Sequence, residues 1–215
     1  MTRIVAISDT HTYHRQMNVP DGDILIHAGD FSFRGGLEEL SSFNSWLKTL
    51  PHRHILLCAG NHDYTLDVSH PGYIEKALDQ ITTGQVITHG SVTVEGLKIF
   101  MSSWTPEFHN WGFNYPPSEA AKLWSHIPND IDILVTHGPA YGILDELDQN
   151  GSMPGLHVGC PELLAAINRV RPKHHVCGHI HEGYGTYKGV HTTFHNVSML
   201  DSRYRTTNPA TVIDL

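Results

Sequence analysis

Residues that can bind metal or transfer protons come directly after five apolar runs of the chain. The most informative group is Gly60-Asn61-His62-Asp63, which follows the run at 55–59 without a spacer. Core packing does not require three such polar side chains at the end of a buried strand. The other four groups follow runs at 4–7, 24–26, 133–135 and 175–177; they are Asp9-Thr10-His11, Gly29-Asp30, His137-Gly138 and Gly178-His179-Ile180-His181. We therefore expect the fold to bring five strand ends together at one site.

The donor atoms in these groups indicate which metals they would bind. The candidate ligands are Asp9, His11, Asp30, Asn61, His137, His179 and His181. The set has no cysteine, which excludes a structural zinc site of the cysteine type. Mixed carboxylate, imidazole and amide donors favour Mn²⁺, Fe, Zn²⁺ or Co²⁺. Seven donors are too many for one catalytic ion with an open position, so they suit two divalent ions, about 3.5–4 Å apart, that share one carboxylate.

The elements that must position these groups can be read from apolar spacing and turn residues. Apolar residues three and four positions apart predict helices at 37–50 and 161–171, each followed by a proline. Short β-type runs at 85–88, 91–95 and 97–102 are separated by His89-Gly90 and Glu95-Gly96, which predicts antiparallel hairpins. We expect a long aromatic loop at 104–117 and a structureless functional loop at 138–159. Strands that alternate with helices and then form a meander predict an α/β fold with mixed sheets, in a single domain over residues 1–215.

Composition excludes several classes of protein. The chain has 215 residues, 40% of them hydrophobic and 17% charged, which is typical of a soluble globular protein. A formal net charge of −8 argues against binding to long nucleic acids or to anionic membranes. No apolar run approaches the roughly 18 residues of a membrane span, and the N-terminal residues do not resemble a signal segment. Three cysteines without a C-x-x-C pair favour free buried thiols in a reducing compartment, so we expect a cytoplasmic protein.

Taken together, the five groups resemble the signature of the calcineurin-like metallophosphoesterases, and their order and spacing match it from residue 8 to residue 182. Further segments are similar to the brain-type metallophosphoesterase-domain subfamily, so that the resemblance covers nearly the whole chain. These segments are Ser103-Trp104-Thr105-Pro106, Trp111-Gly112-Phe113-Asn114, Thr136-His137-Gly138-Pro139, His181-Glu182-Gly183-Tyr184-Gly185 and Asn208-Pro209. The fold that the resemblance implies is a four-layer α/β/β/α sandwich of two mixed β-sheets flanked by helices.

The resemblance also implies a role for each ligand. Asp9, His11 and His181 would hold the first ion; Asn61, His137 and His179 would hold the second, and Asp30 would bridge the two. A hydroxide between the ions would attack phosphorus in line. His62 would be the catalytic histidine, which supplies a proton or a hydrogen bond to the leaving oxygen.

The substrate is less well defined by the sequence. The resemblance implies small phosphodiesters, including cyclic nucleotides, and we expect Mn²⁺ to support activity in vitro. The alternatives are a phosphomonoesterase acting on nucleotides or small phosphates and a catalytically silent protein-binding scaffold. We expect Asn61, His62 and His109 to contact substrate, and Asp63 either to orient His62 or to cap the following turn. The oligomeric state is left open, with a homodimer as one alternative.

Overall fold

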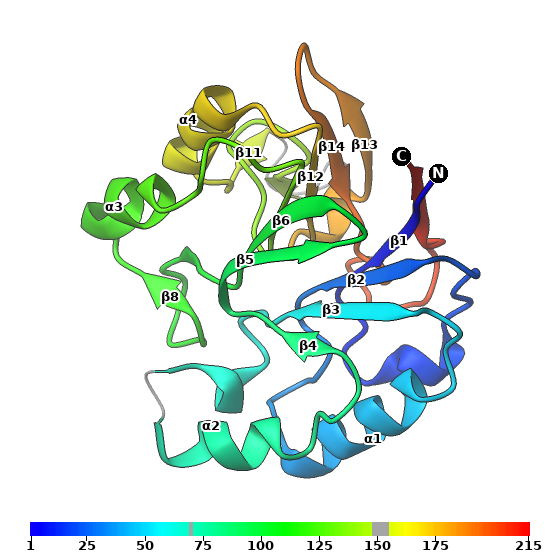
Figure 1. The fold of residues 1–215 in the computed structure, drawn as a ribbon. Helices are drawn as coiled ribbons and strands as arrows, with labels where there is room; N and C mark the ends of the chain where they lie inside the picture. Colours follow the sequence, from blue (N-terminus) through cyan, green and yellow to red (C-terminus); the bar gives the residue numbers. More distant parts are fainter. Residues whose placement is uncertain (69–70, 148–154) are drawn as a thin grey trace.

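The computed structural model describes residues 1–68, 71–147 and 155–215, and it places most strands in two sheets (Figure 1). The first sheet has five strands in the order β15-β1-β2-β3-β4. Their bounds are Thr211–Asp214 (β15), Arg3–Ile7 (β1), Ile24–Ala28 (β2), His54–Cys58 (β3) and Gln85–Val86 (β4). Strands β1 to β4 are parallel to one another, and β15 pairs with β1 in the antiparallel direction.

The second sheet has six strands in the order β13-β14-β12-β9-β6-β5. Their bounds are Gly185–Lys188 (β13), Thr193–Asn196 (β14), His174–Cys177 (β12), Ile133–Thr136 (β9), Leu97–Ser102 (β6) and His89–Val94 (β5). The four central strands are parallel, and the outer strands β13 and β5 are antiparallel to their neighbours. Both sheets are therefore mixed, and the carboxyl ends of the parallel strands form an edge that can carry a site.

Helices cover the outer faces of both sheets, which gives the predicted four layers (Figure 1). The helices α1 (Leu37–Leu47) and α2 (Pro71–Leu78) lie beneath the first sheet, and α3 (Ala120–Ser125) and α4 (Pro161–Val170) flank the second. Short 3-10 helices occur at η1 (Tyr13–Gln16), η2 (Tyr64–Leu66), η3 (Pro117–Glu119) and η4 (His181–Gly183). None of the helices in the described ranges combines the length and the apolar character that a membrane crossing needs.

Side chains on the strands alternate between two apolar layers, as the two-residue period of a strand requires. In β1, Val5 packs with Phe43 of α1 beneath the first sheet. Its neighbour Ile4 points the other way and packs with Ile133 of β9 between the two sheets. A third apolar cluster lies between the second sheet and the helices α3 and α4, and it includes Trp124.

Backbone hydrogen bonds join the two sheets at the edge where the parallel strands end. Ser8, just after β1, donates its N–H to the carbonyl of Val197 at 3.0 Å. The N–H of Met199 donates to the carbonyl of Ser8 at 3.0 Å, so that Ser8 and Ser198 form a parallel bridge between the sheets. This bridge holds the end of β1 beside the end of β14, directly before the first predicted ligand.

Three expectations about connections were wrong. His89-Gly90 is not a turn, because both residues belong to β5, whereas β4 pairs parallel to β3 in the other sheet. Glu95-Gly96 does form the expected hairpin turn between β5 and β6. The loop at 104–117 contains the paired strands β7 (Thr105–Pro106) and β8 (Asn114–Tyr115). The loop at 138–159 contains the antiparallel pair β10 (Glu146–Leu147) and β11 (Leu156–His157), while its residues 148–154 lie outside the described ranges.

The predicted helix at 37–50 ends as an α-helix at Leu47. Beyond that residue the N–H groups of Thr49 and Leu50 donate to carbonyls three residues earlier, those of Trp46 and Leu47. The chain therefore continues the helical direction as a tighter turn up to Pro51, and the apolar spacing could not distinguish these two forms.

Candidate metal centre

The structure brings all seven predicted ligands to the edge where the parallel strands end. Three groups of residues have shared members, and within each group the possible donor atoms lie within 4.8 Å of one another. The groups are Asp9, His11 and His181; His11, Asp30 and His62; and Asp30, His137 and His179. Asp30 belongs to two of these groups, and it lies between the other members. The groups therefore fit two centres that share one carboxylate.

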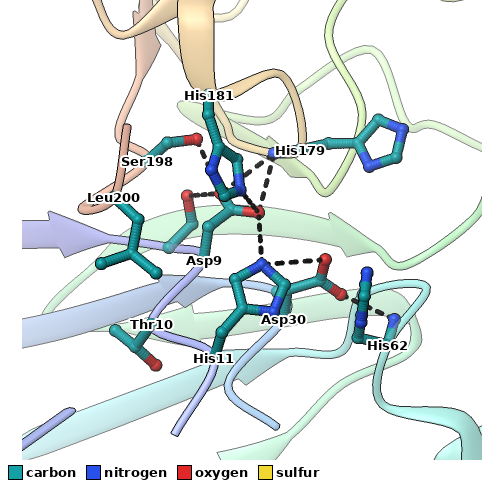
Figure 2. Close-up of polar contacts among 12 residues, drawn as sticks. Asp9, Thr10, His11, Asp30, His62, His179, His181, Ser198 and Leu200 are labelled. Atoms are coloured by element: carbon teal, nitrogen blue, oxygen red, sulfur yellow. Dashed lines mark hydrogen bonds and ion pairs between the residues drawn. The ribbon is translucent and has the colours of Figure 1, made fainter. Parts of the chain in front are cut away.

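The first centre contains Asp9, His11 and His181, with Asp30 beside them (Figure 2). The Nε2 atom of His181 lies 3.6 Å from Oδ1 of Asp9. The Nε2 atom of His11 lies 4.0 Å from that same oxygen and 3.7 Å from Oδ2 of Asp30. These separations are too long for hydrogen bonds. Two donors that each lie about 2.1 Å from one ion are about 3–4.2 Å apart, so the spacing fits a shared cation.

The second centre lies on the other side of Asp30. Nε2 of His137 is 3.3 Å from Oδ2 of Asp30 and 2.9 Å from Oδ1 of Asn61. The ring of His179 lies beside that of His137, with 4.9 Å between the ring centroids. A carboxylate, two imidazoles and an amide oxygen therefore surround one point, and this donor set suits a borderline-to-hard divalent ion.

Glycines precede three of the ligand groups because no side chain would fit there. A Cβ atom on Gly60 would lie 2.2 Å from Oδ1 of Asp30. A Cβ on Gly178 would lie 2.2 Å from Oδ2 of Asp9, and one on Gly29 would lie 2.3 Å from Nδ1 of His137. The Gly residues of the sequence motifs thus provide space for the ligand side chains themselves.

Four ligands have left-handed backbone conformations, which residues other than glycine rarely adopt. The φ angles are 52° at Asp9, 39° at His11, 57° at Asp30 and 69° at His179. Such conformations cost on the order of 1–3 kcal/mol each and cluster at functional sites. These backbone conformations place the donor atoms at the two centres. The rest of the fold must therefore compensate for their cost.

Hydrogen bonds from neighbouring groups fix the orientation of the ligands. The Nδ1 atoms of His137 and His181 lie 2.9 and 3.0 Å from the carbonyls of Ala28 and Asp201. A carbonyl can only accept, so Nδ1 carries the proton and Nε2 is left for a metal. Oδ2 of Asp9 accepts from the hydroxyls of Ser8 and Ser198 at 2.5 and 2.7 Å. This role of both serines could not be predicted from the sequence, because only the bridge between the two sheets brings Ser198 to Asp9.

The ionisation of the cluster follows from burial and from its opposing charges. Burial favours a raised pKa at Asp30, but the facing His137 outweighs it and holds the pKa below its ordinary value. Burial likewise favours a low pKa at His137 and His181, yet the facing carboxylates raise the pKa of each to about 9. His11 and His179 differ, because burial dominates there and lowers each pKa to about 4.

The residues present fit two divalent ions. Both ring nitrogens of His11 are buried and, within the described part of the chain, have no hydrogen-bond partner. A buried polar atom without a partner is unfavourable. A cation bound at Nε2 would give that nitrogen of His11 a partner. The carboxylates of Asp9 and Asp30 lie on either side of this nitrogen. The chemistry of the donor set and the unpartnered imidazole therefore both favour bound metal.

His62 lies at the same cavity but is held differently from the seven ligands. Its backbone N–H donates to Oδ1 of Asp30 at 2.8 Å. Its ring atom Nδ1 lies 2.8 Å from the carbonyl of Phe33. Its ring is 4.6 Å from the ring of His11 and 4.2 Å from that of Trp111, measured between centroids. The contact at Phe33 places the proton on Nδ1. Among the described residues, Nε2 has no hydrogen-bond partner, and His62 lines the cavity.

Asp63 has a role that differs from both predicted ones. Its carboxylate is fully buried and accepts hydrogen bonds from the N–H groups of Asp30, Ser32 and Gly60 at 2.8–2.9 Å. It also accepts from the hydroxyl of Ser32 at 2.5 Å. Asp63 therefore neither orients the His62 ring nor caps the next turn. It ties the loop after β2 to the loop after β3 and so fixes the backbone of Asp30.

A cavity of about 660 Å³ opens over the two centres. His11, Asp30, Asn61, His62, His179 and His181 line its floor, and Phe33, Trp111 and Tyr204 form part of its walls. The ring of Tyr204 lies 5.0 Å from that of His11 and 5.2 Å from that of His181. The sequence analysis did not select Tyr204, because it lies in a turn without a motif. His109 is placed elsewhere, on the wall of a neighbouring hollow.

Comparisons with known proteins agree with this geometry. Residues 2–183 match the family model described as calcineurin-like phosphoesterase. The human protein named metallophosphoesterase domain-containing protein 1 is 39% identical over 235 aligned residues, which cover 100% of this chain and 71% of that protein; the mouse protein of the same name gives the same values. Among solved structures, the phosphopantetheinyl hydrolase PptH from Mycobacterium tuberculosis has a similar fold, with a TM-score of 0.63, 18% identity, and coverage of 94% of this chain and 90% of that one.

Proposed function

The chain belongs to the calcineurin-like phosphoesterase family, and we propose that it is a two-metal phosphodiesterase that cleaves small phosphodiesters. The observation that carries the proposal is the convergence of the seven donors around Asp30, with Nε2 of His62 free at the same cavity. None of the seven positions has lost a ligand-type side chain, which argues against a silent binding scaffold.

Each centre has its own set of residues in this proposal. Asp9, His11 and His181 would hold the first ion, Asn61, His137 and His179 would hold the second, and Asp30 would contribute to both. Divalent ions bound there would neutralise the phosphate oxygens and lower the pKa of a water molecule that attacks phosphorus. The donor set is compatible with Mn²⁺, Fe, Zn²⁺ or Co²⁺.

His62 is the proposed catalytic residue. The Phe33 carbonyl keeps a proton on Nδ1, so the ring can donate from Nε2 only when it is doubly protonated. In that form it gives a proton or a strong hydrogen bond to the leaving oxygen. The adjacent ring of Trp111 and the Phe33 contact hold the imidazole in one orientation. The amide of Asn61 lies at the second centre, where its NH₂ group can donate to a phosphate oxygen.

The cavity has room for an organic group on each side of a phosphate, which is the space that a diester needs. A volume of about 660 Å³ falls within the roughly 300–1,000 Å³ typical of sites for drug-sized ligands, and it exceeds what one phosphate group needs. Aromatic rings of Phe33, Trp111 and Tyr204 line its walls and offer surfaces to organic groups on both sides of a phosphate.

The test compares two chromogenic substrates on one preparation. The protein is stripped with chelator, Mn²⁺ is restored, and kcat/KM is measured for bis(4-nitrophenyl) phosphate and for 4-nitrophenyl phosphate. We expect hydrolysis that depends on the added metal and is faster for the diester. A faster monoester reaction would reject the diester preference in favour of a phosphomonoesterase. No metal-dependent hydrolysis of either ester, with two ions bound, would reject the enzyme.

A further inference from the structure

A second hollow, of about 690 Å³, lies next to the metal cavity. Trp111 lines both spaces and separates them. On one side its ring is 4.2 Å from the ring of His62, and on the other it is 6.3 Å from the ring of Tyr64. A group bound in the second hollow would therefore be separated from His62 by the thickness of one indole ring. The hollow is close enough to take part of a substrate whose phosphate lies at the metals.

The walls of this hollow are largely aromatic. Tyr64 of η2, Tyr73 of α2 and Trp111 come from three separate segments and face the same space. Tyr73 is 59% exposed and lines the hollow. An exposed aromatic ring at the wall of a hollow, such as that of Tyr73, can bind a planar apolar group, and stacking on it does not depend on the identity of a base.

Arg34 gives the hollow a positive charge. Among the residues that line the two cavities, it is the one with a permanent positive charge. Its backbone N–H donates to Glu39 at 3.0 Å, but no ion pair or hydrogen bond engages its guanidinium within the described ranges. A free guanidinium matches a phosphate group, which it can bind through two parallel hydrogen bonds.

From the shared wall, the aromatic faces and the free guanidinium we propose that the hollow binds the second arm of an open-chain phosphodiester, and that this arm is a nucleotide unit with its own phosphate. The proposal rests on the phosphodiesterase function and names its substrate class. A cyclic nucleotide has no second arm, and the cavity over the metals is large enough to hold it alone. The hollow would therefore contribute to the binding of dinucleotide-type substrates and not to that of cyclic nucleotides.

The experiment measures cleavage of the internal linkage of dApdA, with product analysis by chromatography. The same dinucleotide is also tested with a terminal phosphate at its 5′ end and at its 3′ end, and bis(4-nitrophenyl) phosphate serves as the small diester. All are tested on the Mn²⁺-loaded wild type and on Arg34→Gln. Arg15→Gln is the matched control, because Arg15 is exposed on η1 and lines neither cavity.

In the wild type we expect a terminal phosphate at one of the two ends to raise kcat/KM about tenfold, the effect of one charge-assisted hydrogen-bonded contact. In Arg34→Gln this gain should fall below about twofold, and in Arg15→Gln it should remain. Tyr73→Leu should lower kcat/KM for dApdA more than for the small diester, because it removes a stacking surface and keeps the apolar volume.

Two results would overturn the inference while the proposed function stands: no gain from a terminal phosphate in the wild type, or an equal gain in Arg34→Gln. Failure of the function itself is a different result, since the small diester would then not be hydrolysed by the metal-loaded wild type. Circular dichroism of the variants shows whether a change in rate reflects loss of the fold.

Discussion

The space between the two sheets is built in opposite ways at its two ends. Along the strands, Ile4 and Ile133 are fully buried among other apolar side chains. A few residues further along the same strands, Asp9 and His137 are also fully buried, but they are charged or polar. The same pair of sheets thus contains an apolar layer that stabilises the fold and a polar layer that costs free energy without bound ions.

The backbone shows the same contrast. Residues in β1 and β9 have regular strand pairing, whereas Asp9, His11, Asp30 and His179 have positive φ. Polar burial and backbone strain coincide at one edge, and the apolar layer behind it must compensate for both. The comparison implies that changes in the apolar layer affect folding with or without metal, whereas changes at the metal edge affect chiefly metal binding and catalysis.

The largest effect should come from His62, which belongs to the metal edge but is not a proposed ligand. We expect His62→Ala to lower kcat for bis(4-nitrophenyl) phosphate by about 10²–10⁴-fold, the usual range for a lost general acid. Elemental analysis should still find the wild-type metal content. His191→Ala, at an exposed histidine, is the control. Loss of metal together with activity would make His62 a ligand and not the proton donor.

In the apolar layer, Ile133→Ala should lower the free energy of unfolding by about 2–5 kcal/mol, because it leaves a cavity among fully buried side chains. Denaturant titrations of the metal-free and the Mn²⁺-loaded protein should show the same loss, with metal content unchanged. A loss confined to the metal-loaded form would contradict the division between the two layers.

Gly60→Ala, at the metal edge, should weaken metal binding more than it weakens folding. The added Cβ would lie 2.2 Å from Oδ1 of Asp30, so the shared carboxylate must move. We expect metal affinity to fall about 10–100-fold, as for other changes that misorient a ligand. Gly90→Ala is the matched control, since its Cβ would meet its nearest neighbour at 4.0 Å. Calorimetric titration with Mn²⁺ measures both, and equal affinities would contradict the proposed close fit.

Metal binding should also depend on pH. His137 and His181 have pKa values of about 9 in the metal-free protein, one at each centre. A metal must displace these protons, so the metal affinity should rise by about tenfold per pH unit for each proton released. The rise should level off near pH 9. Asp9 and Asp30 have lowered pKa values and are already ionised in this range. Chelator competition at pH 6.5, 7.5 and 8.5 tests this, and a pH-independent affinity would contradict it.

Much of the fold could be predicted from local sequence patterns. The strand His174–Cys177 and the helix that begins at Pro161 have the predicted bounds to within one residue. Both signals are local: a short apolar run, and a proline in the first turn followed by an apolar stripe. The arrangement of the strands in two mixed sheets followed from the resemblance, whereas their order within each sheet was not predicted. Gly90 misled the prediction because a glycine inside a strand resembles a turn residue.

The ligand set was visible because each group follows a strand whose end is defined by its apolar run. The supporting residues were not visible, since their partners are far away in sequence. Ser198 reaches Asp9 across 189 positions, and Asp63 reaches Asp30 across 33. Nothing local in the turn that carries Tyr204 points to the cavity that it lines. Contacts of this kind depend on how the two sheets meet, which no periodic pattern encodes.

The central claim is that the edge of the sheets holds two ions that share Asp30. Electron paramagnetic resonance of the protein with increasing Mn²⁺, together with elemental analysis, tests this most directly. We expect two Mn²⁺ per chain and a spectrum of two exchange-coupled ions, with the coupling lost in Asp30→Asn. Binding of a single ion, or of two ions without coupling, would contradict the claim.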